Sequence, residues 1–103
     1  MDIREAIQER ILFCDGGMGS LLQARGLKPG ELPGTWNITH PEALVEIHRA
    51  YLEAGADIVT TNTFGVDGLK YHEGSGFLAE DVIRAAVRNG QEAIRQSGKK
   101  AYI

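Results

Sequence analysis

Two clusters of small and polar residues, each following a short apolar run, carry the residue types best suited to binding a small molecule. The first spans residues 13–20 and places Asp15 before two glycines; the second spans residues 60–65 and places Asn62 between threonines. A carboxylate can bind a cation such as an ammonium group, and glycines expose backbone N–H groups to an anion. At the carboxyl edge of a parallel α/β fold, this combination predicts a small-molecule site.

The same residues also have structural interpretations, which the sequence leaves open. Asp15 before a glycine is typical of a turn. Gly16 and Gly17 can supply positive φ angles. Asn62 and Thr63 can cap a loop.

Other conspicuous residues favour structural roles. Trp36 is interpreted as an apolar plug under a loop, and Asn37 and Thr39 as capping groups. His48 lies on an apolar helical stripe, which favours a packed core histidine, and Cys14 is interpreted as a small buried hydrophobe. The three histidines and one cysteine lack metal-ligand spacing.

The elements that must position these residues follow from periodicity and turn signals. The apolar runs at 11–14, 58–59 and 101–103 predict three buried parallel strands, because they are too apolar for a two-faced ribbon. A Thr39-x-x-Glu42 capping box opens the clearest helix, which Gly55 ends. Helices are predicted at residues 2–9, 20–25, 39–54 and 78–97, and Gly98 stops the last. The order predicts successive right-handed β/α units, and we expect the chain to be a fragment of a larger domain.

Composition excludes several function classes. The chain has 103 residues, 43% of them hydrophobic and 24% charged, with a net charge of -3, so it is globular and lacks the basic face of a nucleic-acid-binding protein. No apolar run reaches the roughly 20 residues of a membrane span. A single cysteine favours a reducing cytoplasm. Position 22 is leucine rather than the third glycine of a dinucleotide fingerprint, which argues against nucleotide binding.

Three blocks, at residues 15–19, 36–41 and 54–65, resemble the homocysteine S-methyltransferase family, most of all the homocysteine-binding module of its cobalamin-dependent, methionine-forming branch. The resemblance implies an α/β fold made of the first three β/α units of a (β/α)8 TIM barrel, incomplete in this chain. Residues 1–103 would then be the N-terminal portion of a homocysteine-binding barrel domain.

The resemblance also implies an enzyme that transfers a methyl group to zinc-bound homocysteine to form methionine. Zinc and cobalamin are implied for the complete protein. The family's three zinc-binding cysteines lie on later strands, beyond residue 103, and Cys14 does not match them. We therefore expect no catalytic residue, metal ligand or bound cofactor in this chain, and no activity from the chain alone.

By the same resemblance, this chain contributes part of the homocysteine pocket. Asp15 would receive the ammonium group, and the backbone at Gly16 and Gly17 would approach the carboxylate. The second edge would be lined by Thr61, Asn62 and Thr63. The expected partners are homocysteine and either the remainder of the barrel or a second copy of the chain.

Two further hypotheses remain. The chain could be a non-catalytic α/β binding or assembly module that pairs through the open edge of its sheet. It could also be a complete flavodoxin-like domain, although three strands are too few for that fold.

Overall fold

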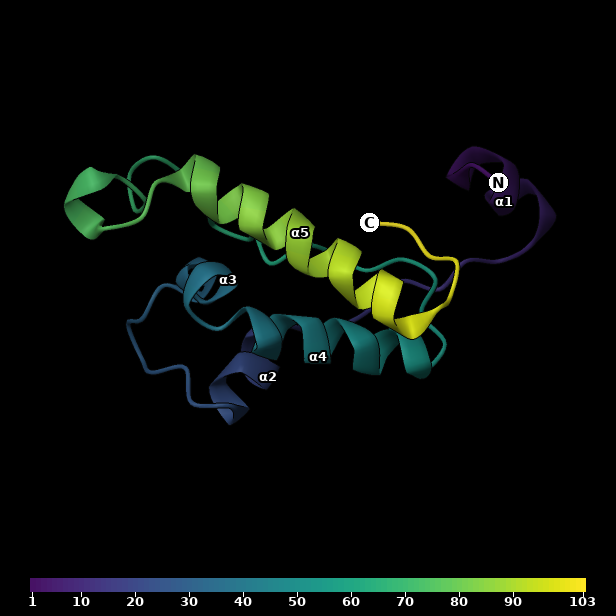
Figure 1. Ribbon diagram of the computed structural model, residues 1–103, viewed down its shortest axis with the longest axis horizontal. Coiled ribbons are helices and arrows are strands. Elements are labelled where there is room, and N and C mark those ends of the chain that lie inside the picture. The colour runs from purple at the N-terminus through teal and green to yellow at the C-terminus, as the bar shows by residue number, and fades with distance from the viewer.

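The computed structural model describes residues 1–103 as helices joined by loops and extended segments (Figure 1). The helices, in chain order, are α1 (Ile3–Glu9), α2 (Gly19–Ala24), the 3-10 helix η1 (Pro33–Thr35), α3 (Trp36–Thr39), α4 (Pro41–Glu53), the 3-10 helix η2 (Glu73–Ser75) and α5 (Ala79–Ser97). None of them combines the length and apolar character needed to cross a lipid bilayer.

The two long helices, α4 and α5, form the centre of the structure. They lie side by side and run in the same direction (Figure 1). The predicted stripe of α4 is buried at Leu44, Ile47 and Leu52, whereas α5 buries mainly small residues, which let the helices approach closely. Gly98, with a φ of 68°, ends α5 at the predicted position.

Two apolar clusters flank this helix pair. The first joins α2, α3 and α4 through Leu22, Leu27, Trp36, Ala43, Leu44 and Ile47. The second joins α4, α5 and one extended segment through Val45, Leu52, Val59 and Ala93. Trp36 is 4% exposed, and its Nε1 donates to Oε2 of Glu31 at 2.9 Å, so its interpretation as a plug under the loop is confirmed.

The predicted fold class is wrong for this structure, because no strand and no sheet form. The three runs expected to be strands are extended segments that touch only through isolated parallel bridges, Cys14 with Ile58 and Ile58 with Tyr102. The structure therefore contains helices linked by extended segments, rather than the first three β/α units of a TIM barrel.

The physical reason lies in the small number of partners that each segment has. The two outer segments each meet a neighbour on one side only, and parallel pairing is stable mainly where both faces are covered. Ile11 and Phe13 are 77% and 62% exposed, so the first run is not buried as its apolar sequence predicted.

Two local predictions also fail. Thr39 forms no capping box with Glu42, because α4 begins after His40 and the Thr39 hydroxyl donates to the carbonyl of Thr35 at 3.1 Å. In α1 only Ala6 is buried, whereas Ile3 and Ile7, which helical spacing would place on the same face, are exposed.

A buried aspartate joins the extended segments. Asp57 accepts a hydrogen bond from the N–H of Phe13 at 3.0 Å, and it pairs with Arg10 at 3.1 Å and with Lys99 at 3.6 Å. The hydrogen bond from Arg10, followed by the one from the Phe13 N–H, lowers the pKa of Asp57 from 3.8 to about 2. Its own N–H donates to the Phe13 carbonyl, and its carbonyl accepts from the N–H of Tyr102.

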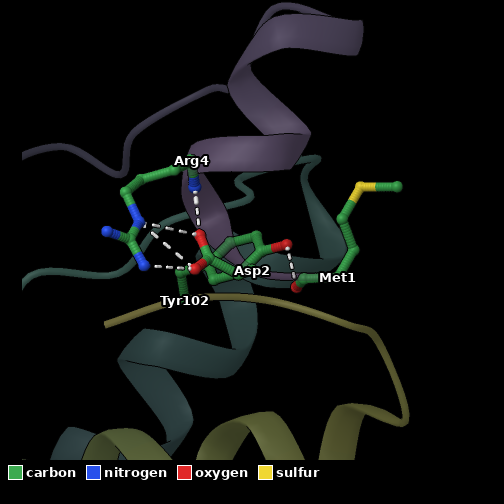
Figure 2. A network of polar contacts seen from close by, with 4 residues as sticks. All are labelled: Met1, Asp2, Arg4 and Tyr102. Atoms are coloured by element: carbon green, nitrogen blue, oxygen red, sulfur yellow. Dashed lines mark hydrogen bonds and ion pairs between the residues drawn. The ribbon is translucent and has the colours of Figure 1, made fainter.

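The two ends of the chain also meet, as Figure 2 shows. The hydroxyl of Tyr102 donates to the carbonyl of Met1 at 3.0 Å. Asp2 caps α1 by accepting from the N–H of Arg4 at 2.6 Å, and its carboxylate pairs with the guanidinium of Arg4. These contacts fix α1 beside the last extended segment, away from the main helix pair.

Replacing Asp57 with asparagine removes the charge that Arg10 and Lys99 share, so the free energy of unfolding at pH 7 should fall. Because the pKa of this carboxyl drops from 3.8 to about 2 on folding, its stabilisation is complete above pH 3.8 and is lost as the pH falls through 2. Urea unfolding, followed by circular dichroism, should show the wild type and Asp57→Asn converging at the acid end of this range.

The control is Glu9→Gln, which changes an exposed carboxylate that makes no hydrogen bond or ion pair. This variant should follow the wild type at every pH. If the difference in the free energy of unfolding between Asp57→Asn and the wild type stayed constant down to pH 2, the charge of Asp57 would not be the source of this stabilisation.

Candidate functional site

Asp15 joins the two polar loops that the sequence singled out. Its Oδ2 accepts from the N–H of Thr60 at 2.8 Å, and its Oδ1 accepts from the Thr60 hydroxyl at 2.9 Å. The N–H of Asp15 donates to the carbonyl of Ile58 at 2.9 Å. The loops therefore meet at one edge of the molecule. Each carboxylate oxygen keeps a second acceptor position for another donor.

The two glycines after Asp15 lie against Tyr51 of α4. Neither has a positive φ, so the interpretation that they supply such angles is wrong. A Cβ on Gly16 would lie 3.2 Å from the Tyr51 hydroxyl oxygen, and that hydroxyl donates to the carbonyl of Gly17 at 2.6 Å. The N–H groups of both glycines donate to no protein atom, so they are free to bind an anion.

The second loop turns tightly around Asn62. The N–H of Thr63 donates to the carbonyl of Thr61 at 2.8 Å, and the two threonine hydroxyls hydrogen-bond at 2.9 Å. Asn62 is buried and its Nδ2 donates to the carbonyl of Pro33 at 3.0 Å and to Oδ1 of Asn37 at 2.9 Å. Asn62 is therefore fixed by hydrogen bonds of its side chain.

Asn37 is the centre of this network, and its interpretation as a capping group is wrong. Asn37 is only 1% exposed. Its Nδ2 donates to the carbonyl of Asn62 at 2.9 Å and to that of Val82 at 3.2 Å. Asn89 of α5 donates to the carbonyl of Asn37 at 3.0 Å. The partners of Asn37 are 25, 45 and 52 residues away along the chain, so no local pattern could have found them.

His48 is buried in α4, as expected for a core histidine, but neither of its ring nitrogens has a hydrogen-bond partner. Burial lowers its pKa below 6.5, and the negative charge of Asp15 opposes this effect. Burial therefore disfavours the charged imidazolium form of His48.

Sequence reasoning also missed Thr60 and Tyr51 as parts of this edge. Thr60 holds both oxygens of the Asp15 carboxylate, and Tyr51 holds the carbonyl of Gly17. Thr60 directly follows the second apolar run, which was a usable signal. Tyr51 fell on the apolar stripe of its helix, which concealed the role of its hydroxyl.

The larger surface clefts lie elsewhere. One of about 420 Å³ is lined by Arg25, Gly26, Trp36, His40, Glu42, Ala43 and Glu46. Another of about 360 Å³ is lined by Phe13, Cys14, Tyr51, Ala54, Gly55 and Ala56. None of the six predicted site residues lines either of these clefts.

The residues of this chain do not fit the zinc site that the resemblance implies. No group of three or more histidine, cysteine, aspartate or glutamate side chains is placed to hold a metal ion. Cys14, the single thiol, is exposed and stands alone.

Comparisons with known proteins agree on one family. A family model described as homocysteine S-methyltransferase matches residues 12–103. Methionine synthases of Mycobacterium tuberculosis and Mycobacterium leprae are each 43% identical over 70 residues, which is 62% of this chain and 6% of theirs. The chain thus spans only a small part of the length of these relatives.

Solved structures give a related result. The homocysteine methyltransferase MmuM of Escherichia coli, in its oxidized form, superimposes with a TM-score of 0.76 at 21% identity, over 98% of this chain and 38% of that one. Its metallated form gives a TM-score of 0.75 at 19% identity, with the same coverage. At such identities, the likeness is one of fold alone.

Replacing His48 with leucine should remove an acid-sensitive element of the core. Because burial lowers the pKa of His48, the unfolded chain binds a proton first, and stability declines as the pH falls below 6.5. The His48→Leu variant should lose this part of the decline, as measured by urea unfolding between pH 7.5 and the folded pKa.

The matched control is Ile47→Leu, which alters packing on the same helix without changing a titratable group. It should keep the decline of the wild type. If His48→Leu and the wild type lost stability equally over this range, the protonation of His48 would not be the cause of the acid-induced loss.

Proposed function

Because the chain belongs to the homocysteine S-methyltransferase family, we propose that the complete protein transfers a methyl group to the sulfur of homocysteine. Two relatives that carry the name methionine synthase favour methionine as the product. Within this reaction, the chain contributes part of the pocket for the amino-acid end of homocysteine, as the N-terminal portion of the homocysteine-binding domain. A cytoplasmic location belongs to the same proposal.

The observation that carries this proposal is the pair of hydrogen bonds between Asp15 and Thr60. They place a carboxylate with free acceptor positions beside the free N–H groups of Gly16 and Gly17. An amino acid carries an ammonium group and a carboxylate on one carbon, and this edge offers a complementary group for each. Thr61, Asn62 and Thr63 would contact the ligand from the other loop.

The residue types indicate which group of homocysteine each residue would bind. Asp15 would bind and orient the ammonium group, while Thr60 keeps the carboxylate in place. The N–H groups of Gly16 and Gly17 would bind the homocysteine carboxylate, and Tyr51 supports their loop from below. Zinc and cobalamin are proposed for the complete protein only, held by residues other than those of this chain. The isolated chain is expected to bind homocysteine without transferring a methyl group.

A second candidate function is a non-catalytic assembly module. The exposed side chains of Ile11 and Phe13 favour it, although the absence of a sheet removes the sheet edge through which pairing was expected. Light scattering after size exclusion, over a range of concentrations, distinguishes the two. A monomer that binds homocysteine supports the pocket; a stable dimer that does not bind it supports assembly.

Replacing Asp15 with asparagine should weaken the binding of L-homocysteine about 10-fold or more, since a hydrogen bond to a charged group contributes about 1.5–3 kcal/mol. The Asp15→Asn variant keeps one oxygen for Thr60, so the loop should stay in place. The measurement is an NMR titration of the isotope-labelled chain.

Asp81→Asn is the control, because Asp81 is an exposed carboxylate in the first turn of α5 that makes no side-chain hydrogen bond to either loop. Its affinity for L-homocysteine should equal that of the wild type. If Asp15→Asn bound L-homocysteine as tightly as the wild type, Asp15 would not contact the ligand. A wild-type chain that does not bind L-homocysteine at all would overturn the proposal.

A further inference from the structure

The buried amides of Asn37 and Asn62 have no freedom to turn over. Nδ2 of Asn37 donates to two backbone carbonyls, those of Asn62 and Val82, and Nδ2 of Asn62 donates to the carbonyl of Pro33. A carbonyl oxygen can only accept a hydrogen bond, so a nitrogen must face each of these three oxygens. The orientation of both amides follows from the backbone around them.

This orientation commits every amide hydrogen of the pair. The two hydrogens of Asn37 Nδ2 go to the two carbonyls, and those of Asn62 Nδ2 go to Pro33 and to Oδ1 of Asn37. A primary amide has two donor hydrogens and no more. Asn62 therefore has no donor left for a ligand.

Oδ1 of Asn62 is the one polar atom of that side chain still available. No protein group donates to it, and it is not among the buried polar atoms that lack a partner, so it is open to solvent. It belongs to the loop whose first residue, Thr60, holds the Asp15 carboxylate. The two joined loops thus supply two hydrogen-bond acceptors, the charged carboxylate of Asp15 and the neutral Oδ1 of Asn62.

We propose that Asn62 binds ligands only as a hydrogen-bond acceptor and therefore recognises the ammonium group rather than the carboxylate of the amino acid. Asn37 is the positioning residue that accepts the second Nδ2 hydrogen of Asn62 and so leaves it no donor for a ligand. The inference rests on the proposed function, since it assigns a role within the same amino-acid pocket. A thiol that carries an ammonium group should therefore bind this site more tightly than one that carries only a carboxylate.

Two truncated analogues of homocysteine test this polarity. 3-Mercaptopropylamine keeps the ammonium group and lacks the carboxylate, whereas 4-mercaptobutanoate keeps the carboxylate and lacks the ammonium group. Binding of each probe and of L-homocysteine to the chain is measured by NMR. In Asn62→Ala, the affinities for the amine and for homocysteine should fall about 10-fold, while that for 4-mercaptobutanoate should not change.

The positioning role of Asn37 is tested by the ratio of the affinity for 3-mercaptopropylamine to that for 4-mercaptobutanoate. A general loss of stability would not change this ratio. In Asn37→Ala, one Nδ2 hydrogen of Asn62 loses its acceptor and becomes available to a carboxylate, so the preference of the wild type for the amine over 4-mercaptobutanoate should shrink several-fold. Asn89→Ala is the matched control, because it removes a donor to the Asn37 carbonyl and leaves the Asn62 amide bonds in place. Its ratio should equal that of the wild type.

The wild-type chain supplies a measurement that does not depend on whether the variants fold. The amine probe should shift the Asn62 carbonyl carbon and leave its two amide protons protected from exchange. Weakened binding of 4-mercaptobutanoate in Asn62→Ala, exposure of the amide protons, or an unchanged ratio in folded Asn37→Ala would overturn this inference alone. Failure of all three probes to bind the wild type would overturn the proposed function with it.

Discussion

The buried amide of Asn37 is the constraint on which the arrangement of this chain depends most. A buried amide that lacks partners destabilises a fold by about 1–3 kcal/mol for each unsatisfied group, so its bonds must be made together or not at all. Those bonds reach the loop at Asn62 and the backbone of α5 at Val82, while α5 returns a donor from Asn89. One side chain therefore sets the position of the second loop relative to the helix pair.

A second constraint acts on the other half of the site. Asp57 links the extended segments that precede and follow it, through Arg10, the Phe13 N–H and Lys99. The Asp15 loop begins two residues after Phe13, and the Thr60 loop begins three residues after Asp57, so this charge cluster also sets where the loops start. The two loops meet at one edge even though no sheet forms, because the side-chain hydrogen bonds of Asp15 and Asp57 reinforce the few backbone hydrogen bonds between the segments.

The sequence predicted the parts of the structure that depend on neighbours close along the chain. The stripe of α4 and the end of α5 at Gly98 are confirmed, and the family indicated by the three motif blocks is confirmed as well. The strands failed because an apolar run forms a strand only when partners cover it, and Phe13 is left exposed. The role of Asn37 was hidden because its partners come from distant segments, whereas the capping interpretation considered only adjacent residues. The ligand contacts of Asp15, Gly16, Gly17 and residues 61–63 stay predictions.

The proposed function requires homocysteine to bind where the Asp15 loop meets the Thr60 loop. The most direct measurement is a ¹⁵N-resolved NMR titration of the wild-type chain with L-homocysteine, read residue by residue across the backbone amides. The account predicts that the largest shifts fall on Gly16, Gly17 and residues 60–63. Shifts concentrated instead around Arg25, Trp36 and His40, which line the largest cleft, would contradict it.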